Sequence, residues 1–247
     1  MRSFGRFAVV LAAFSCSANA TTLLADNFDS EAPGVSSWNY DQFANFTVVG
    51  GSVNLVHSGD ETYQGVIECS GQAGGCVDLA GYLTSAGTLR TATFQFLAGY
   101  RYTLSFDLSG SQRQFGPHDW IASLVLDAPV DAIVFLNSPN WLARTGITRL
   151  SVMGERGTLD WFETVTLAFQ ADSAGQFYAE IGSGSYDGQG PVLDNVLLTE
   201  TRMTGGAVPE PSTWVLLAIG IGIIGRAMRL RREGKLGNGA LHSDAIA

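Results

Sequence analysis

Apolar side chains recur at every second position along much of this chain, and that period of two constrains the fold more than any other feature. Between residues 100 and 108, polar residues alternate with the apolar side chains of Tyr100, Tyr102, Leu104, Phe106 and Leu108. Such alternation is typical of an antiparallel strand that buries one face and exposes the other. The segment therefore predicts a strand on the surface of a hydrophobic core.

Similar alternating segments follow one another, and no convincing amphipathic helix occurs between residues 21 and 207. Gly- and Ser-rich turn sequences separate them. The last segment is expected to bury Val192, Val196 and Leu198, and the charged Asp194 is expected to face solvent. About eight to eleven short strands with such turns predict an all-β fold, an antiparallel β-sandwich of the jelly-roll type over residues 21–203.

The first twenty residues have the three parts of a secretory signal peptide. Arg2 and Arg6 precede an apolar stretch from Phe7 to Phe14, and small residues follow up to Ala18-Asn19-Ala20. A basic region, a short apolar region and an Ala-x-Ala site predict a signal peptide over residues 1–20. The chain is therefore expected to leave the cytoplasm, with cleavage after Ala20.

The other end of the chain has the composition of a membrane anchor. An apolar run begins at Thr213, directly after Val208-Pro209-Glu210-Pro211-Ser212, and continues to Gly225. We expect a linker at residues 204–212, one transmembrane helix with its basic flank at 213–232, and a disordered tail at 233–247. Trp214 would lie at the outer interface, and the positive-inside rule places four arginines on the cytoplasmic side. These are Arg226, Arg229, Arg231 and Arg232.

This order of a Pro-Glu-Pro motif, a short apolar helix and an arginine cluster resembles the PEP-CTERM sorting signal. The resemblance implies that an exosortase, a membrane cysteine transpeptidase, recognises Pro209, Glu210 and Pro211 and processes the chain. It implies exosortase and the membrane as partners. It also implies an inner-membrane anchor with a periplasmic ectodomain, which reaches the cell surface or extracellular matrix after processing.

Acidic side chains dominate the segment between the two ends. Residues 21–212 contain 7 Lys and Arg against 21 Asp and Glu, a net charge of −14, and the first lysine of the chain is Lys235. A domain this acidic excludes nucleic-acid binding through phosphate neutralisation. The charge suits divalent cations, or solubility outside the cell.

Two cysteines remain after the signal peptide, which contains Cys16, is removed. Cys69 and Cys76 flank a Gly-rich loop of six residues in a chain bound for an oxidising compartment. This spacing predicts a local disulfide. A zinc site is the alternative, although no nearby pair of histidines is present to complete four ligands.

Parts of the ectodomain resemble the galactose-binding-like jelly rolls found in carbohydrate-binding modules. The segments that carry this resemblance are residues 26–31 with Trp38, residues 98–107 and residues 190–198.

The resemblance implies a structural calcium ion between the first and last strands, bound by Asp29, Glu31 and Asp194. The alternative is that these acids are solvated turn and strand residues. Calcium is the only cofactor expected.

Enzyme signatures are absent from the sequence: it contains no nucleophile elbow, no zinc-protease motif and no Walker A loop. His118 beside Asp119 would be a base next to its orienting acid, but neighbours in a loop rarely reach that geometry. We expect a non-enzymatic surface or matrix protein that binds extracellular polysaccharide. A secreted glycan-active hydrolase with paired carboxylates is the alternative.

Sugar rings stack on aromatic faces, so a glycan-binding site is expected to use aromatic side chains near loops or strand ends. Those side chains are Trp120, Trp141, Tyr63 and Tyr186.

Overall fold

The computed structural model describes residues 20–31, 34–62, 65–82, 86–113, 116–136, 141–185 and 187–203. In this part of the chain the helical content is one 3-10 turn, η1, at Ser70–Gln72. Among these residues, none belongs to a helix with the length and hydropathy of a membrane span. The predicted signal peptide, except Ala20, and the predicted linker, transmembrane helix and tail after residue 203 lie outside the described residues.

The strands pair in antiparallel fashion, and thirteen of them form one hydrogen-bonded sheet. In chain order they are β1 (Ala20–Asp26), β2 (Ser37–Tyr40), β3 (Phe46–Val49), β4 (Val53–His57), β5 (Glu61–Thr62), β6 (Gly65–Val66), β7 (Gly75–Asp78), β8 (Thr88–Thr91), β9 (Phe94–Phe96), β10 (Tyr100–Ser109), β11 (His118–Leu136), β12 (Trp141–Arg156), β13 (Glu163–Ala171), β14 (Gly175–Ser183) and β15 (Val192–Arg202). The pair β5 and β6 forms a separate small sheet.

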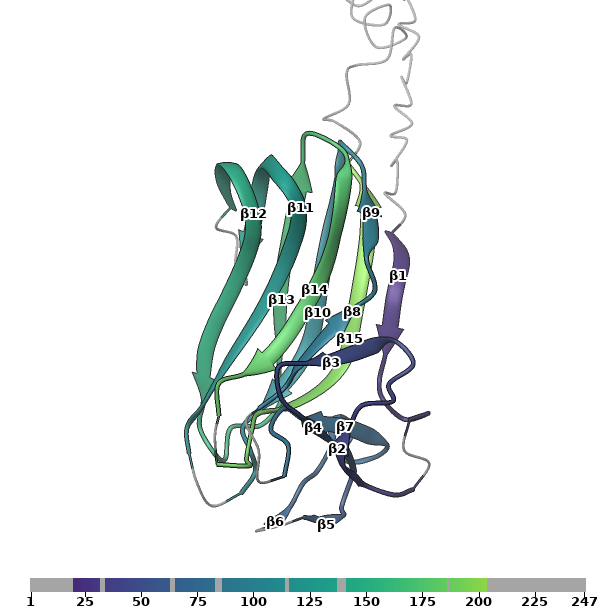
Figure 1. Cartoon of the computed structure of the whole chain (residues 1–247), viewed down its shortest axis with the longest axis vertical. Coiled ribbons are helices and arrows are strands. Elements are labelled where there is room, and N and C mark those ends of the chain that lie inside the picture. The colour runs from purple at the N-terminus through teal and green to yellow at the C-terminus, as the bar shows by residue number, and fades with distance from the viewer. Residues whose placement is uncertain are drawn as a thin grey trace, which may run out of the picture. The chain divides into compact units, whose positions relative to one another are not determined.

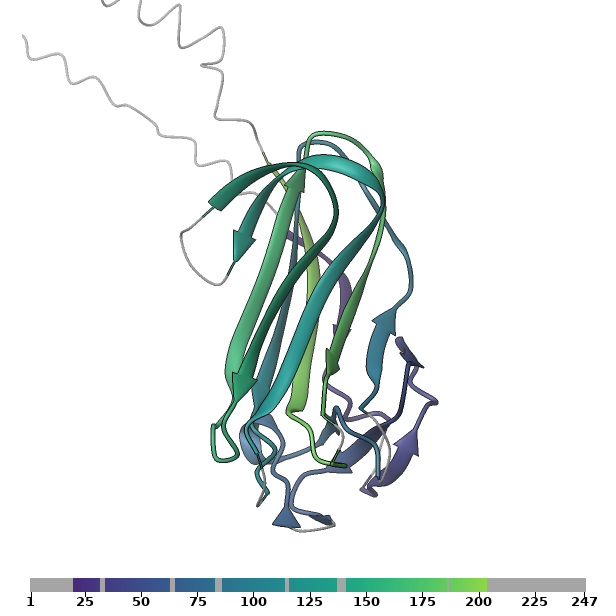
Figure 2. The ribbon, with the colours of Figure 1, turned by 60° about the vertical axis from the view of Figure 1, so that its left-hand side comes forward.

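The large sheet folds over into two facing layers, as Figures 1 and 2 show. One layer contains β13, β10 and β15, and β1, β7, β4 and β2 extend it beyond β15. The other contains β12, β11, β14, β8 and β3, with β9 beside β14. The long strand β11 joins them, because its first part pairs with β14 and its last part with β13. The predicted all-β antiparallel sandwich is confirmed.

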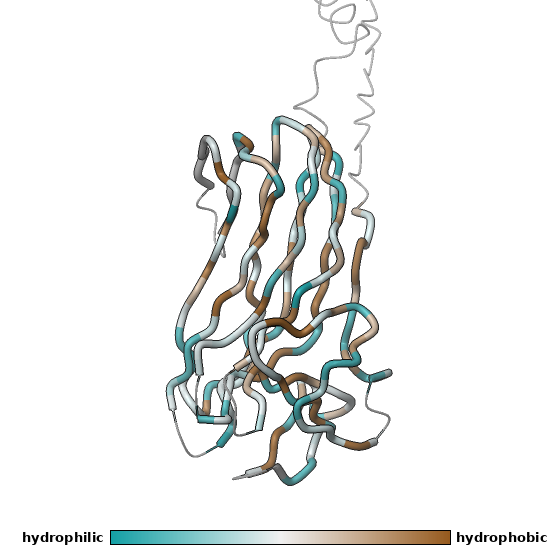
Figure 3. The backbone as a smooth tube through the Cα atoms, viewed as in Figure 1, coloured by the Kyte–Doolittle hydropathy of each residue, from teal (hydrophilic) through white to brown (hydrophobic). Residues whose placement is uncertain are grey.

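Aromatic side chains fill the space between the layers. Tyr102 of β10 and Phe169 of β13 contact Phe177 of β14, with ring centroids 5.3 and 5.4 Å apart. All three are buried, and aromatic pairs at such distances stabilise a core beyond their buried area. Hydrophobic and hydrophilic residues alternate along these strands (Figure 3), as the period of two requires. The predicted inward face of β10 is confirmed, since four of its members are fully buried: Tyr102, Leu104, Phe106 and Leu108.

The predicted last stripe is confirmed for Val196 and Leu198, whereas Val192 is buried in a different cluster, and a β-bulge in β15 explains the difference. Between Ser105 and Asp107 of β10, the paired stretch of β15 has one extra residue. Asn195 lies in this stretch with a φ of 51°, in the left-handed region that asparagine tolerates better than most residues. The bulge shifts the alternation. The main core receives Leu193, Val196 and Leu198, whereas Val192 packs in a second, smaller cluster.

A buried ion pair lies where β7 meets the loop after β10. The Arg113 guanidinium is 2.7 Å from a carboxylate oxygen of Asp78, and both side chains are almost fully buried. Asp78 also accepts hydrogen bonds from the side chain of Asn54 and the backbone amides of Ala80 and Gly190. Burial raises the pKa of Asp78, while Arg113 and these donors oppose the rise. Four segments of the chain are thus held together at one carboxylate.

Replacing Arg113→Met should lower the free energy of unfolding by about 3–5 kcal/mol, because it leaves a buried carboxylate without its counter-charge. Arg156→Met is a matched control. Arg156 pairs with Glu163, which is 72% exposed, so the expected loss there is within about 1 kcal/mol. Urea denaturation of both variants measures the difference, and equal losses would contradict a special role for the Asp78 pair.

Candidate functional site

The residues of the predicted sorting signal lie outside the described residues. They are Pro209, Glu210 and Pro211 of the motif, and Trp214, Arg226, Arg229, Arg231 and Arg232 of the anchor. The structure therefore bears on sites in the sandwich alone.

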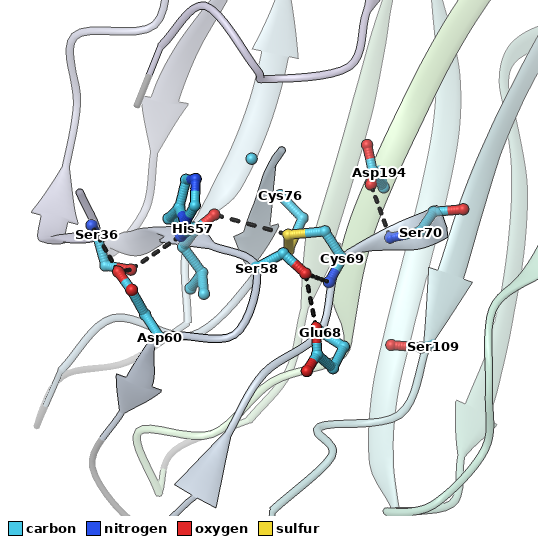
Figure 4. Close-up of a disulfide and its surroundings, with 12 residues drawn as sticks. Ser36, His57, Ser58, Asp60, Glu68, Cys69, Ser70, Cys76, Ser109 and Asp194 are labelled. Carbon is cyan, nitrogen blue, oxygen red and sulfur yellow. Dashed lines mark hydrogen bonds between the residues drawn. A yellow bond between two sulfur atoms is a disulfide. The ribbon is translucent and has the colours of Figure 1, made fainter. Parts of the chain in front are cut away.

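The predicted disulfide is present between Cys69 and Cys76, whose Cα atoms lie 5.5 Å apart. Both cysteines are buried in the smaller hydrophobic cluster, together with Val56, Ile67 and Val192. The bridge closes the loop that contains η1 and holds it against the outer face of β15 (Figure 4). This loop covers a surface that the alternation alone would leave in water.

Asp194 lies beneath the disulfide loop and is 3% exposed. One carboxylate oxygen accepts the backbone N–H of Ser70 at 3.0 Å, and the other accepts that of Asn195 at 2.6 Å. Burial and the charges of Asp29 and Asp107 together raise the pKa of Asp194 to about 7, although the two backbone donors oppose the rise. The prediction that Asp194 faces solvent is therefore wrong, because the loop covers the outer face of the strand here.

The three predicted calcium ligands lie in two places. The charge of Asp29 acts on Asp194, but Glu31 binds elsewhere and accepts the backbone N–H of Ala44 at 2.8 Å and the hydroxyl of Tyr40 at 3.4 Å. Among the described residues, no three His, Cys, Asp or Glu side chains form a group that could hold a metal ion. As arranged, the three acids do not fit the ion, and calcium binding stays a prediction from the family resemblance.

The raised pKa of Asp194 makes stability depend on pH. An unfolded Asp titrates near pH 3.9, so between about pH 4 and pH 7 the folded state binds more protons than the unfolded state. The contribution of Asp194 to the free energy of unfolding therefore falls as pH rises through this range. Asp194→Asn should remove that slope. Denaturation of the wild type and this variant at several pH values measures it, and curves that stay parallel would contradict the assignment.

Two aromatic rings lie side by side on the surface, one from β2 and one from the loop after β7. Trp38 is 41% exposed and Tyr82 is 37% exposed, and their ring centroids are 5.9 Å apart at an interplanar angle of 43°. Large aromatic side chains usually bury more of their area, so a pair of half-open rings is an unusual surface. The pair offers two apolar faces to solvent.

Local backbone features hold this pair in place. In β2 the pairing with β4 shifts by one residue between Ser37 and Tyr40, and Asn39 has a φ of 50°. Bulges of this kind redirect side chains. Before Tyr82, Gly81 packs so tightly that a Cβ atom there would overlap the hydroxyl of Ser52. The sequence offers one signal for this site, a glycine directly before an aromatic residue at the end of a buried strand.

The aromatic residues predicted as glycan contacts are not the ones on this surface. Trp120 is 7% exposed, because it points inward from β11 and meets Phe106 at 6.2 Å. That prediction is wrong for Trp120. Tyr63, Tyr186 and the side chain of Trp141 lie outside the described part.

A shallow depression of about 340 Å³ is lined by His118, Ser185 and Asp187, among others. These are residue types that a hydrolase would use, but their geometry does not make a catalytic triad. The Ser185 hydroxyl is 3.2 Å from Nδ1 of His118, and the nearest oxygen of Asp187 is 4.0 Å from the same nitrogen. A triad needs the nucleophile and the acid on opposite nitrogens of the ring. His118 is also buried, whereas Asp119 is exposed, so the two neighbours point to opposite faces of β11.

Comparison with known families identifies the carboxy-terminal segment. Residues 207–232 match the PEP-CTERM protein-sorting motif. Among curated proteins, none has a sequence that matches this chain.

Several solved structures are similar to the sandwich. One is a Clostridium thermocellum endo-1,4-beta-D-xylanase 10B comprising CBM22-1 and GH10 modules, with a TM-score of 0.40 and 10% identity; the match covers 73% of this chain and 28% of that one. A second is the CBM22-1 xylan-binding domain from Paenibacillus barcinonensis Xyn10C, with a TM-score of 0.42, 9% identity and coverage of 77% and 100%. A third is the K1 cleaved adhesin domain of Lys-gingipain from Porphyromonas gingivalis, with a TM-score of 0.40, 14% identity and coverage of 72% and 97%.

Proposed function

We propose that this chain, which carries the PEP-CTERM sorting motif at residues 207–232, is an exported surface protein whose sandwich binds extracellular polysaccharide through Trp38 and Tyr82. The motif marks a protein sent to the surface through an exosortase-dependent, carboxy-terminal membrane signal. The observation that carries the binding proposal is the pair of exposed rings 5.9 Å apart.

The chemistry of the ring pair suits a sugar. One side of a pyranose ring presents C–H groups that pack on an aromatic face, and its hydroxyls need polar partners around the edge. Polar groups adjoin the pair: Ser52 donates a hydrogen bond to the side chain of Asn39 at 2.8 Å, directly after Trp38. The two ring faces are tilted relative to each other and form an open surface rather than a deep pocket. An open surface fits a polymer better than a small molecule.

A hydrolytic function has no comparable support. The Ser185 hydroxyl and the Asp187 carboxylate lie by the same nitrogen of His118, and this arrangement lacks a chain of nucleophile, base and orienter. We therefore propose a binding protein rather than an enzyme.

Removing the two rings should weaken binding to exopolysaccharide purified from the producing cells. Trp38→Ala with Tyr82→Ala should lower the affinity by about tenfold or more, because exposed rings contribute stacking and apolar contact. Trp161→Ala is the matched control, since Trp161 is 49% exposed and lies on another loop. Retardation in gels containing the polysaccharide measures the affinity. Equal retardation of both variants would overturn the site.

The sorting motif should act as a recognition element rather than a spacer. Pro211 disfavours helical geometry at Glu210, and neither proline offers an amide hydrogen, so the motif resists becoming part of the helix that follows. Changing Pro209, Glu210 and Pro211 to alanine should leave membrane insertion intact and abolish processing. Deletion of residues 226–232 should instead disturb insertion and orientation.

The measurement is the mass of the mature protein in cells with and without the exosortase. The wild type should be shorter only when the enzyme is present. An identical mature mass for the wild type and the triple-alanine variant would show that the motif has no role in processing.

A further inference from the structure

The outer face of β11, β12 and β14 contains a second candidate site, a hollow of about 400 Å³. Cross-strand register places Ile121 opposite Met153 and Asp119 opposite Glu155. All four side chains belong to the exposed face of the two strands, and Met153 is 70% exposed. We call these four residues the β11–β12 patch.

Glycines adjoin the hollow on the side of β14. Gly184, directly after β14, lines the hollow next to Asp119, and Gly182 of β14 lies opposite Ile121. A Cβ atom at Gly182 would be 2.4 Å from the hydroxyl of Thr88, so a side chain there would require Thr88 to move. At Gly184 the hollow is therefore bordered by backbone rather than by a side chain.

The two carboxylates of the patch stand directly opposite each other, which is an unfavourable arrangement. Like charges at paired positions of neighbouring strands destabilise a sheet. Within the described residues, no basic side chain forms an ion pair with Asp119 or Glu155. On the same face, Arg149 is held by Glu180 at 3.0 Å. A cationic ligand would relieve this repulsion.

A third carboxylate extends the acidic rim. Asp187 lines the adjoining depression, which shares Asp119 and Gly184 with the hollow. The whole segment of residues 21–212 carries a net charge of −14, so an anionic polymer would be repelled over a long range. The surface therefore combines an apolar floor, the exposed backbone of Gly184 and a negative rim.

We propose that the β11–β12 patch binds the amine-bearing sugars of a polysaccharide. This inference rests on the proposed function, and it names the chemical class of glycan that the domain selects. The C–H face of an amino sugar would pack on Ile121 and Met153, its ammonium group would face Asp119 and Glu155, and its hydroxyls would meet the exposed backbone of Gly184. A basic peptide could satisfy the carboxylates, but the polysaccharide binding proposed for the same domain favours a sugar.

The test compares two oligosaccharides that differ at each sugar in one N-acetyl group, which removes the positive charge of the amine. Calorimetry with the purified full-length chain in detergent would use β-1,4-linked hexamers of glucosamine and of N-acetylglucosamine, in mildly acidic buffer that protonates the amines. At about 0.01 M salt the glucosamine hexamer should bind about tenfold more tightly, and at about 1 M salt, where the Debye length is near 3 Å, the difference should vanish.

The variant Asp119→Asn with Glu155→Gln keeps shape and removes both charges, so it should abolish the preference for the amine and raise thermal stability slightly. Asp127→Asn with Asp172→Asn removes two exposed charges elsewhere and should keep the preference. Equal affinity for the two hexamers, or a preference that survives in the first variant, would overturn the inference. Displacement of the glucosamine hexamer by an equal concentration of hexalysine would also overturn it, in favour of a basic peptide.

These outcomes are separable from those for the proposed function. If amine selectivity is absent but gel retardation by exopolysaccharide still depends on Trp38 and Tyr82, the inference fails and the proposed function stands. If neither hexamer nor exopolysaccharide binds, both fail.

Discussion

Contact between the aromatic rings of the two layers is the interaction on which the other features depend. The ring centroids of Tyr102, Phe169 and Phe177 lie 5.3–5.4 Å apart, and these contacts join β10 and β13 of one layer to β14 of the other. Their packing fixes the distance between the layers and the direction in which each strand faces. Tyr102 also accepts the backbone N–H of Leu97 through its hydroxyl, so its polar tip is satisfied inside the core. Both candidate sites lie on surfaces whose orientation follows from this packing.

Much of the fold could be predicted from the sequence, because alternation in a strand with one buried face reports directly on burial. The inward residues of β10 and the disulfide between Cys69 and Cys76 followed from such local patterns. The bulges did not. Asn39 and Asn195 adopt left-handed backbone conformations that asparagine allows but does not require, and the neighbouring strands decide whether it does so. The placement of Val192 outside the main core and the surface position of Trp38 have this same origin.

The sites were harder to predict than the fold, since their residues meet through topology rather than through spacing. Trp38 comes from β2 and Tyr82 from the loop after β7. Asp119 faces Glu155 because β11 and β12 pair in one register, although other registers would bury the same residues. Aromatic content alone pointed to Trp120, which the structure buries. For Asp194, the sequence showed a charged side chain that favours solvent, but neither the bulge at Asn195 nor the loop that covers the carboxylate.

The pairing of the first and last strands determines how such a domain can be presented. Ala20 of β1 lies opposite Thr201 of β15, so the chain enters and leaves the sandwich at the same end, while β2 and the start of β11 lie at the other (Figure 1). Eleven residues of β15 separate the two ends, a length of about 36 Å at the rise of an extended strand. Residues 204–206 alone intervene before the sorting motif. The body of the sandwich therefore separates β2 and the start of β11 from the two ends of the described chain by the length of one rigid strand.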